Sequence, residues 1–100
     1  MRFRFLDEKL RDLYTAERGA RAYPSQVIEA FFEAMAVIAA MPDERGLRLQ
    51  KGFRYEKLKG RRAKERERSL RLNDQWRLVV KPLEDSNGRY LLVVRVEDYH

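Results

Sequence analysis

The sequence has 100 residues, of which 44% are hydrophobic and 38% are charged, and its net charge is +6. A chain of this length has room for one modest hydrophobic core, so we expect a single domain over residues 1–100. Cysteine is absent and histidine occurs once, which excludes disulfides, thiolate metal sites and a zinc site built from several imidazoles, and we expect no cofactor.

The N-terminus predicts a strand followed by a helix. Residues 1–6 alternate polar and apolar side chains, which is the pattern of a half-buried strand. The same alternation lacks the apolar block of a secretory signal, so we expect the protein to be cytoplasmic. Asp7 offers a helix N-cap, and apolar residues follow it at helical spacing. This pattern predicts a short amphipathic helix over residues 7–18.

A second helix is predicted between Pro24 and Pro42. Apolar residues recur there three and four positions apart, a spacing typical of core packing against a sheet. The stripe consists of Ile28, Phe31, Phe32, Met35, Ile38 and Ala39. The nearly apolar stretch from Ala30 to Met41 is interrupted by Glu33 and is well short of the roughly 20 residues that span a bilayer. We therefore expect a buried helix and no membrane association.

Residues 53–80 have the spacing of strands. Phe53 to Leu58 predicts a strand, and Lys59 to Glu67 predicts a charged loop or hairpin tip. Residues 69–72 and 75–80 flank Asn73-Asp74, whose side chains tolerate turn conformations. They predict a tight antiparallel hairpin.

Residues 85–88 form a second turn signal, and residues 89–98 predict the closing strand. Its Leu91-Leu92-Val93-Val94 segment is apolar on both faces, which favours a central position in the sheet. The order of elements is β-α-α-β-β-β. It predicts an α+β fold with the N-terminal strand and two helices packed on one face of an antiparallel sheet.

Positive charge is concentrated in one segment. Residues 45–71 contain twelve basic and three acidic residues, a charge of +9, which leaves −3 for the rest of the chain. Concentrated positive charge attracts the phosphates of nucleic acids, so nucleic acid is the leading partner class. An anionic membrane surface, an acidic protein or a merely solvated basic face would also account for this charge.

The side chains suited to proton transfer gather at the C-terminus. The single histidine, His100, follows Asp98 and Tyr99 directly after the predicted central strand, although a terminal residue is more often frayed than functional. RNA can be cleaved without a metal when a base takes the 2′-hydroxyl proton, cations stabilise the phosphorane and an acid protonates the leaving oxygen. Arg77 and Lys59 could supply the positive charge. If Trp76 faces the core, Arg77 faces outward.

The remaining polar and basic residues of this half are candidates for contact with an RNA backbone or for a plain solvated surface. The candidates are Arg54, Glu56, Lys57, Arg61, Arg62, Lys64, Arg66, Arg68 and Arg71. Tyr55 and Tyr99 could stack on unpaired bases, although core packing is the favoured interpretation for Tyr55.

Three motifs resemble those of a known family. They are Leu58-Lys59-Gly60, the run Ser69 to Leu78 with its Asn-Asp-Gln-Trp-Arg core, and the closing Val96 to His100. They resemble the LKG, SIRINDQWRI and VDYH motifs of HigB-like killer toxins in the RelE/ParE superfamily. The resemblance covers Gly52 to His100, and in the first half only the layout of a strand and two helices agrees.

The resemblance implies a toxin of a bacterial toxin-antitoxin pair that enters the ribosomal A site and cleaves translated mRNA by a metal-independent reaction. It implies that Lys59, Arg77, Asp98, Tyr99 and His100 are the catalytic residues. The implied partners are the ribosome, mRNA and a HigA-like antitoxin with a helix-turn-helix, through which alone the toxin would reach operator DNA.

Two features depart from the family pattern. Glu56 stands where some members carry a histidine, so its proton-transfer role is either lost or taken by a carboxylate. The segment between Gly60 and Ser69 is longer and more basic than usual. A ParE-like inhibitor of DNA gyrase, or a catalytically idle RNA-binding protein, are the alternative functions.

Overall fold

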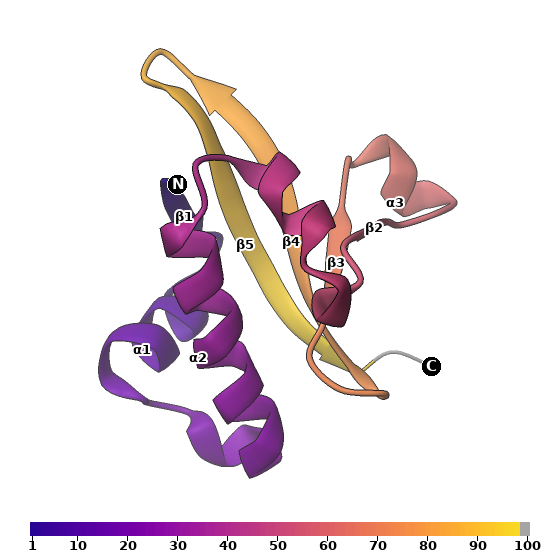
Figure 1. Cartoon of the computed structure of the whole chain (residues 1–100). Coiled ribbons are helices and arrows are strands. Elements are labelled where there is room, and N and C mark those ends of the chain that lie inside the picture. The colour runs from indigo at the N-terminus through magenta and orange to yellow at the C-terminus, as the bar shows by residue number, and fades with distance from the viewer. Residues whose placement is uncertain (99–100) are drawn as a thin grey trace.

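The computed structural model describes residues 1–98 and confirms the predicted α+β fold class (Figure 1). Its elements, in chain order, are β1 (Phe3–Phe5), α1 (Glu8–Ala16), η1 (Ala20–Ala22), α2 (Ser25–Ala40), η2 (Glu44–Leu49), η3 (Lys51–Phe53), β2 (Glu56–Lys57), α3 (Arg61–Lys64), β3 (Arg68–Arg71), β4 (Trp76–Asp85) and β5 (Gly88–Asp98). The helices labelled η are 3-10 helices. Figure 1 shows α1 and α2 together on one side of the β4–β5 pair and α3 beside β2 and β3.

The five strands form one sheet in the order β1-β5-β4-β3-β2. The closing strand β5 is therefore interior, as its apolar sequence predicts, and the predicted hairpin is the antiparallel pair β3–β4. The sheet is mixed rather than wholly antiparallel, because β1 runs parallel to β5. Strand β1 joins β5 from the other end of the chain, so no hairpin turn imposes an antiparallel direction on it.

Both predicted helices are present. The Asp7 side chain accepts a hydrogen bond from the backbone N–H of Leu10 at 3.1 Å, which confirms the N-cap of α1. Helix α1 ends at Ala16, two residues before the predicted end, because Glu17 takes the left-handed conformation with φ of 55°. Helix α2 has the predicted bounds.

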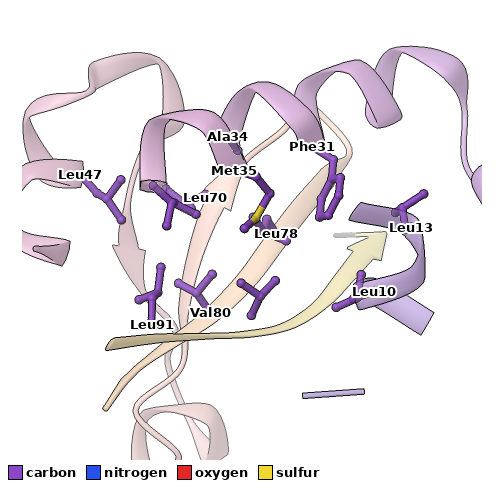
Figure 2. Close-up of a cluster of buried hydrophobic side chains, with 12 residues drawn as sticks. Leu10, Leu13, Phe31, Ala34, Met35, Leu47, Leu70, Leu78, Val80 and Leu91 are labelled. Atoms are coloured by element: carbon purple, nitrogen blue, oxygen red, sulfur yellow. The ribbon is translucent and has the colours of Figure 1, made fainter. Parts of the chain in front are cut away.

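The helices bury their apolar stripes against one face of the sheet (Figure 2). Phe31 and Met35 of α2 meet Leu78 of β4, while Leu10 and Leu13 of α1 cover the neighbouring part of the same cluster. All of these side chains are buried. The Phe and Met stripe is core, as predicted.

The other face of the sheet, which we call the distal face, carries a second and smaller apolar cluster. Val79, Val94 and Leu58 are buried in it. Because successive side chains of a strand point to opposite faces, Val79 faces away from the helices that cover its neighbour Leu78.

A β-bulge in β5 changes which of its side chains reach the distal face. Val79 pairs with Arg95 but the next residue of β4 pairs with Val93, so Val94 is an extra residue on β5. After the bulge, Val96 packs against the helix-side core. Arg95 and Glu97 consequently lie on the distal face, where regular alternation from Val93 would place Val96.

The connection between the helical and strand halves differs from the prediction. The strand expected over Phe53 to Leu58 is reduced to the two residues of β2. It is short because η3 is a helical turn and Arg54, with φ of 45°, is left-handed, so extended backbone begins only after it. The loop expected over Lys59 to Glu67 contains the short helix α3.

Within residues 1–98, no helix combines the length and the apolar composition needed to cross a membrane.

Leu78 tests the packing of helices on sheet. It is fully buried in the helix-side core, so Leu78→Ala should lower the free energy of unfolding by about 2 to 5 kcal/mol. Leu49 is 82% exposed, and Leu49→Ala should change it by less than about 0.5 kcal/mol. Urea unfolding followed by Trp76 fluorescence measures both. Equal losses in the two variants would contradict the described core.

Candidate active site

Arg77 lies on the distal face of the sheet. Its neighbour Trp76 packs edge-on against Tyr23, with ring centroids 5.6 Å apart, on the side of the helices. Arg77 therefore points to the opposite face, as the sequence predicts when Trp76 faces inward. The Arg77 Nη1 donates to the carbonyl oxygens of Asn73, at 2.6 Å, and Trp76, at 3.1 Å. These bonds hold the guanidinium near the start of β4.

A row of charged residues crosses three strands at this level. Arg71 of β3 is paired with Arg77, and Arg77 with Glu97 of β5. Residues paired across antiparallel strands point to the same face, so the three side chains are neighbours on the distal face. Arg71 also forms an ion pair with Asp74 in the turn of the hairpin.

Lys59 lies at the margin of the same face. It follows Leu58, which is buried against Val79 and Val94 in the distal cluster, and Lys59 itself is exposed. The fold thus brings Lys59 and Arg77 to one face of the sheet from segments about twenty residues apart in the sequence.

Asp98 ends the described part of β5 beside the start of β4. It is paired with Trp76, and one of its carboxylate oxygens accepts a hydrogen bond from the Gln75 side-chain amide at 3.1 Å. The two remaining predicted catalytic residues, Tyr99 and His100, lie outside the described residues. The position of Asp98 directs β5 toward the end of β4 that carries Arg77.

Four charged side chains join α3 to the distal face. Arg62 of α3 donates two hydrogen bonds of 2.6 Å to the two carboxylate oxygens of Glu97. Arg95 donates to Glu97 at 2.9 Å and to both carboxylate oxygens of Glu67, at 2.9 and 3.2 Å. We call these four residues the ion-pair network. Bidentate arginine-carboxylate pairs fix geometry strongly, so the network holds α3 against β5.

Burial separates the two kinds of partner in the network. The side chains of Glu67 and Glu97 are only 10% and 14% exposed, whereas those of Arg62 and Arg95 are each 38% exposed. Burial alone would raise the pKa of Glu97, but the hydrogen bonds from Arg62 and Arg95 outweigh it and leave the pKa below its ordinary value. Glu97 is therefore a carboxylate at neutral pH. Its hydrogen bonds also raise the pKa of Arg62.

The candidate RNA-contact residues are divided between several places. Arg61 and Lys64 are exposed on α3, and Arg54 and Glu56 are exposed around β2. Arg62 and Arg71 belong to the ion pairs just described. Lys57, Arg66 and Arg68 line hollows on the side of the sheet that faces the helices. No one surface gathers the whole set.

Glu67, Arg95 and Glu97 take part in this site although the sequence pattern does not single them out. Arg95 and Glu97 stand in an apolar strand whose simple alternation gives no sign of the bulge at Val94. Glu67 is one of three acidic residues in a strongly basic segment, which is the one signal that could have marked it. Within residues 1–98, no group of three or more acidic or histidine side chains is placed to hold a metal ion.

Comparison with known proteins places this arrangement in a family. The family model described as the RelE-like toxin of type II toxin-antitoxin system HigB matches residues 3–99. A solved structure of a YoeB/ParE toxin from Agrobacterium tumefaciens has the same fold, with a TM-score of 0.59 and 16% sequence identity over 100% of both chains. No curated protein matches the chain in sequence.

Glu97→Gln tests the ion-pair network. The amide keeps the shape but loses the charge that both arginines bind, so the free energy of unfolding should fall by about 1 to 3 kcal/mol at neutral pH. Because the pKa of Glu97 is lowered in the folded state, the stabilisation is complete above its ordinary value of 4.5 and is lost as the pH falls through the lower folded-state value.

Thermal unfolding between neutral and acidic pH measures this effect. The difference between Glu97→Gln and the unchanged protein should be largest near neutral pH and should shrink below about pH 4. Glu65→Gln is the matched control, because Glu65 is 63% exposed in its 3.4 Å pair with Lys81. A difference that stayed constant into acid would contradict the role assigned to the Glu97 charge.

Proposed function

The chain belongs to the HigB-like family, the RelE-like toxins of type II toxin-antitoxin systems, and from this premise we propose that it is a ribosome-dependent endoribonuclease that cleaves mRNA and halts translation. Membership implies a toxin and a cognate antitoxin partner. The proposal adds the reaction, its substrate and the residues that perform it.

The proposed reaction needs no metal. A base removes the proton of an RNA 2′-hydroxyl, and the oxygen attacks the adjacent phosphorus. The bond to the 5′-oxygen of the next nucleotide breaks as an acid protonates that oxygen. The products are a 2′,3′-cyclic phosphate and a 5′-hydroxyl end.

The proposed roles divide between cations and proton carriers. Arg77 and Lys59 stabilise the negative charge of the phosphorane, and the forked guanidinium of Arg77 suits phosphate oxygens. His100 and Asp98 transfer the protons, and Tyr99 positions or stacks on a nucleotide. The contact with RNA extends to the exposed cations of α3, Arg61 and Lys64.

One observation supports this proposal above the others: Arg77 lies on the distal face at the end of β4 beside which β5 delivers Asp98. A strand fixes the direction in which the C-terminal residues leave the sheet. Lys59 lies at the margin of the same face. Cations and candidate proton carriers thus come from three separate segments toward one region.

The antitoxin, the ribosome and mRNA are the proposed partners, in the cytoplasm. The antitoxin is proposed to be HigA-like, with a helix-turn-helix that carries any contact with operator DNA. A membrane is not among the proposed partners.

Inhibition of DNA gyrase is the second candidate function. The named neighbour is a YoeB/ParE toxin, and at 16% identity this likeness concerns the fold. The closing Asp98-Tyr99-His100 favours the nuclease, because inhibition by binding alone has no need of a proton-carrying triad. A ribosome-binding protein without nuclease activity is the third candidate, which the replacement of a family histidine by Glu56 would favour.

His100→Ala tests the reaction. It should lower the cleavage rate of mRNA on translating ribosomes by about a hundredfold to ten-thousandfold, because general acid-base catalysis contributes that much. Purified protein, programmed ribosomes and analysis of the RNA ends provide the measurement. The unchanged protein should leave 2′,3′-cyclic phosphate ends. A His100→Ala variant that cleaves at the original rate would refute its assigned role.

Arg77→Met tests the electrostatic part separately. Loss of the guanidinium should lower the single-turnover rate by about a hundredfold to a thousandfold, because the charge acts on the phosphorane. Arg77→Lys should retain part of the activity, since it keeps the charge without the fork. Arg18→Met, at an exposed position after α1, is the control. Unfolding curves exclude a loss of structure, and a full rate in Arg77→Met would remove this residue from the site.

A further inference from the structure

Two adjoining hollows lie away from the distal face. The larger has a volume of about 720 Å³, and its lining includes Lys57, Arg66, Arg68 and Arg89. The smaller has a volume of about 290 Å³ and is lined by Arg48, Tyr55, Lys57 and Arg68. They share Lys57 and Arg68, so a single extended ligand could occupy both.

The register of the strands assigns these hollows to the helix side of the sheet. Lys57 of β2 is paired with Arg68 of β3, and Arg68 with Val80 of β4. Paired residues share a face, and Val80 is buried in the core beneath the helices. Arg77 points to the opposite face. The hollows therefore cannot hold the phosphodiester that Arg77 contacts.

The cations of the hollows have no carboxylate partners. Among residues 1–98, none of the ion pairs involves Arg48, Lys57, Arg66 or Arg68, whereas eleven such pairs are present elsewhere. Of the acidic residues in the lining, Glu44 accepts a hydrogen bond from Tyr55 and pairs with Arg89. The hollows therefore keep an excess of positive charge.

Arg68 is the best-defined of these cations. Its Nε is buried and has no hydrogen-bond partner within the described part of the chain. Its Nη1 donates to the carbonyl oxygens of Arg66, at 3.1 Å, and Glu67, at 3.4 Å, which fixes the plane of the guanidinium. A guanidinium that has lost water without gaining a carboxylate is stabilised by an anion brought to it.

We propose that these hollows form a second RNA-binding site that holds backbone phosphates on the side of the sheet opposite to the reacting phosphodiester. Three of the four unpaired cations are arginines, whose forked donors match phosphate oxygens. Two adjoining hollows suit a chain of anions better than one isolated anion. The inference deepens the proposed function, on which its choice of RNA rests, and adds Arg48 to the RNA-contact residues.

The site contributes affinity and not chemistry. Phosphate contacts release counterions, so each lost contact lowers the dependence of binding on salt. They also carry no sequence information. Removal of these cations should weaken binding uniformly across RNA sequences.

The test uses Arg48→Gln/Arg68→Gln and a short 2′-O-methylated RNA, which cannot be cleaved by 2′-hydroxyl attack. Fluorescence anisotropy at several salt concentrations measures the affinity. Affinity at low salt should fall about tenfold or more, and the slope of log affinity against log salt should fall by about one to two. Lys9→Gln/Arg18→Gln removes the same charge at exposed positions in and after α1, and should change affinity less than twofold.

Further arms keep the outcome decisive. Lys57→Gln changes an exposed side chain and should weaken binding in the same direction even if the double variant were to unfold. Inorganic phosphate at an equal concentration of phosphate groups should not displace the RNA, and displacement would make this a site for a small free anion. Tighter binding of polyglutamate, dependent on Arg48 and Arg68, would assign the site to an acidic protein instead.

Failure of this inference differs from failure of the proposed function. Equal RNA affinity in Arg48→Gln/Arg68→Gln and Lys9→Gln/Arg18→Gln would overturn the second site, whatever the protein does to mRNA. Absence of mRNA cleavage by the unchanged protein would overturn the nuclease proposal and leave the binding measurement standing.

Discussion

The extra residue in β5, Val94, determines which side chains stand on each face of the central strand. Regular alternation from Val93 onward would turn Arg95 and Glu97 toward the helices and Val96 toward the distal face. Two charged groups would then face an apolar core without partners, which is strongly unfavourable. The bulge instead sends Val96 into the core and both charged residues to the distal face, and it sets the phase in which β5 reaches Asp98.

The ion-pair network follows from this placement. Because Arg95 and Glu97 reach the distal face, they can bind Glu67 and Arg62, and so fasten the short helix α3 to the sheet. A helix of four residues has little stability of its own, so its position depends on these contacts. Several cations of the basic segment are thus used to build the site, while Arg77 and Lys59 border it. The cations around Arg68 lie on the other side of the sheet, where the network cannot neutralise them.

Sequence reasoning succeeded where one local pattern determines the structure. The stripe containing Phe31 and Met35 predicted α2 and its core, Asp7 predicted a helix cap, and Asn73-Asp74 predicted the β3–β4 hairpin. It failed where distant segments decide: the parallel direction of β1, the shortness of β2 and the bulge at Val94 depend on packing between residues far apart in the chain. For the site, the outward direction of Arg77 followed from Trp76, but the partners of Arg62 could not be read from its charge run. The roles of Tyr99 and His100 stay predictions, because these residues lie outside the described part of the chain.

The central claim is that this toxin acts on translated mRNA. Mapping of RNA 5′ ends across all transcripts, shortly after induced expression in bacteria, tests it most directly, with DNA breaks recorded from the same cultures. The account predicts new 5′-hydroxyl ends inside translated reading frames, few in untranslated RNA, and intact DNA. Intact mRNA together with accumulating DNA breaks would contradict it and favour the inhibition of gyrase.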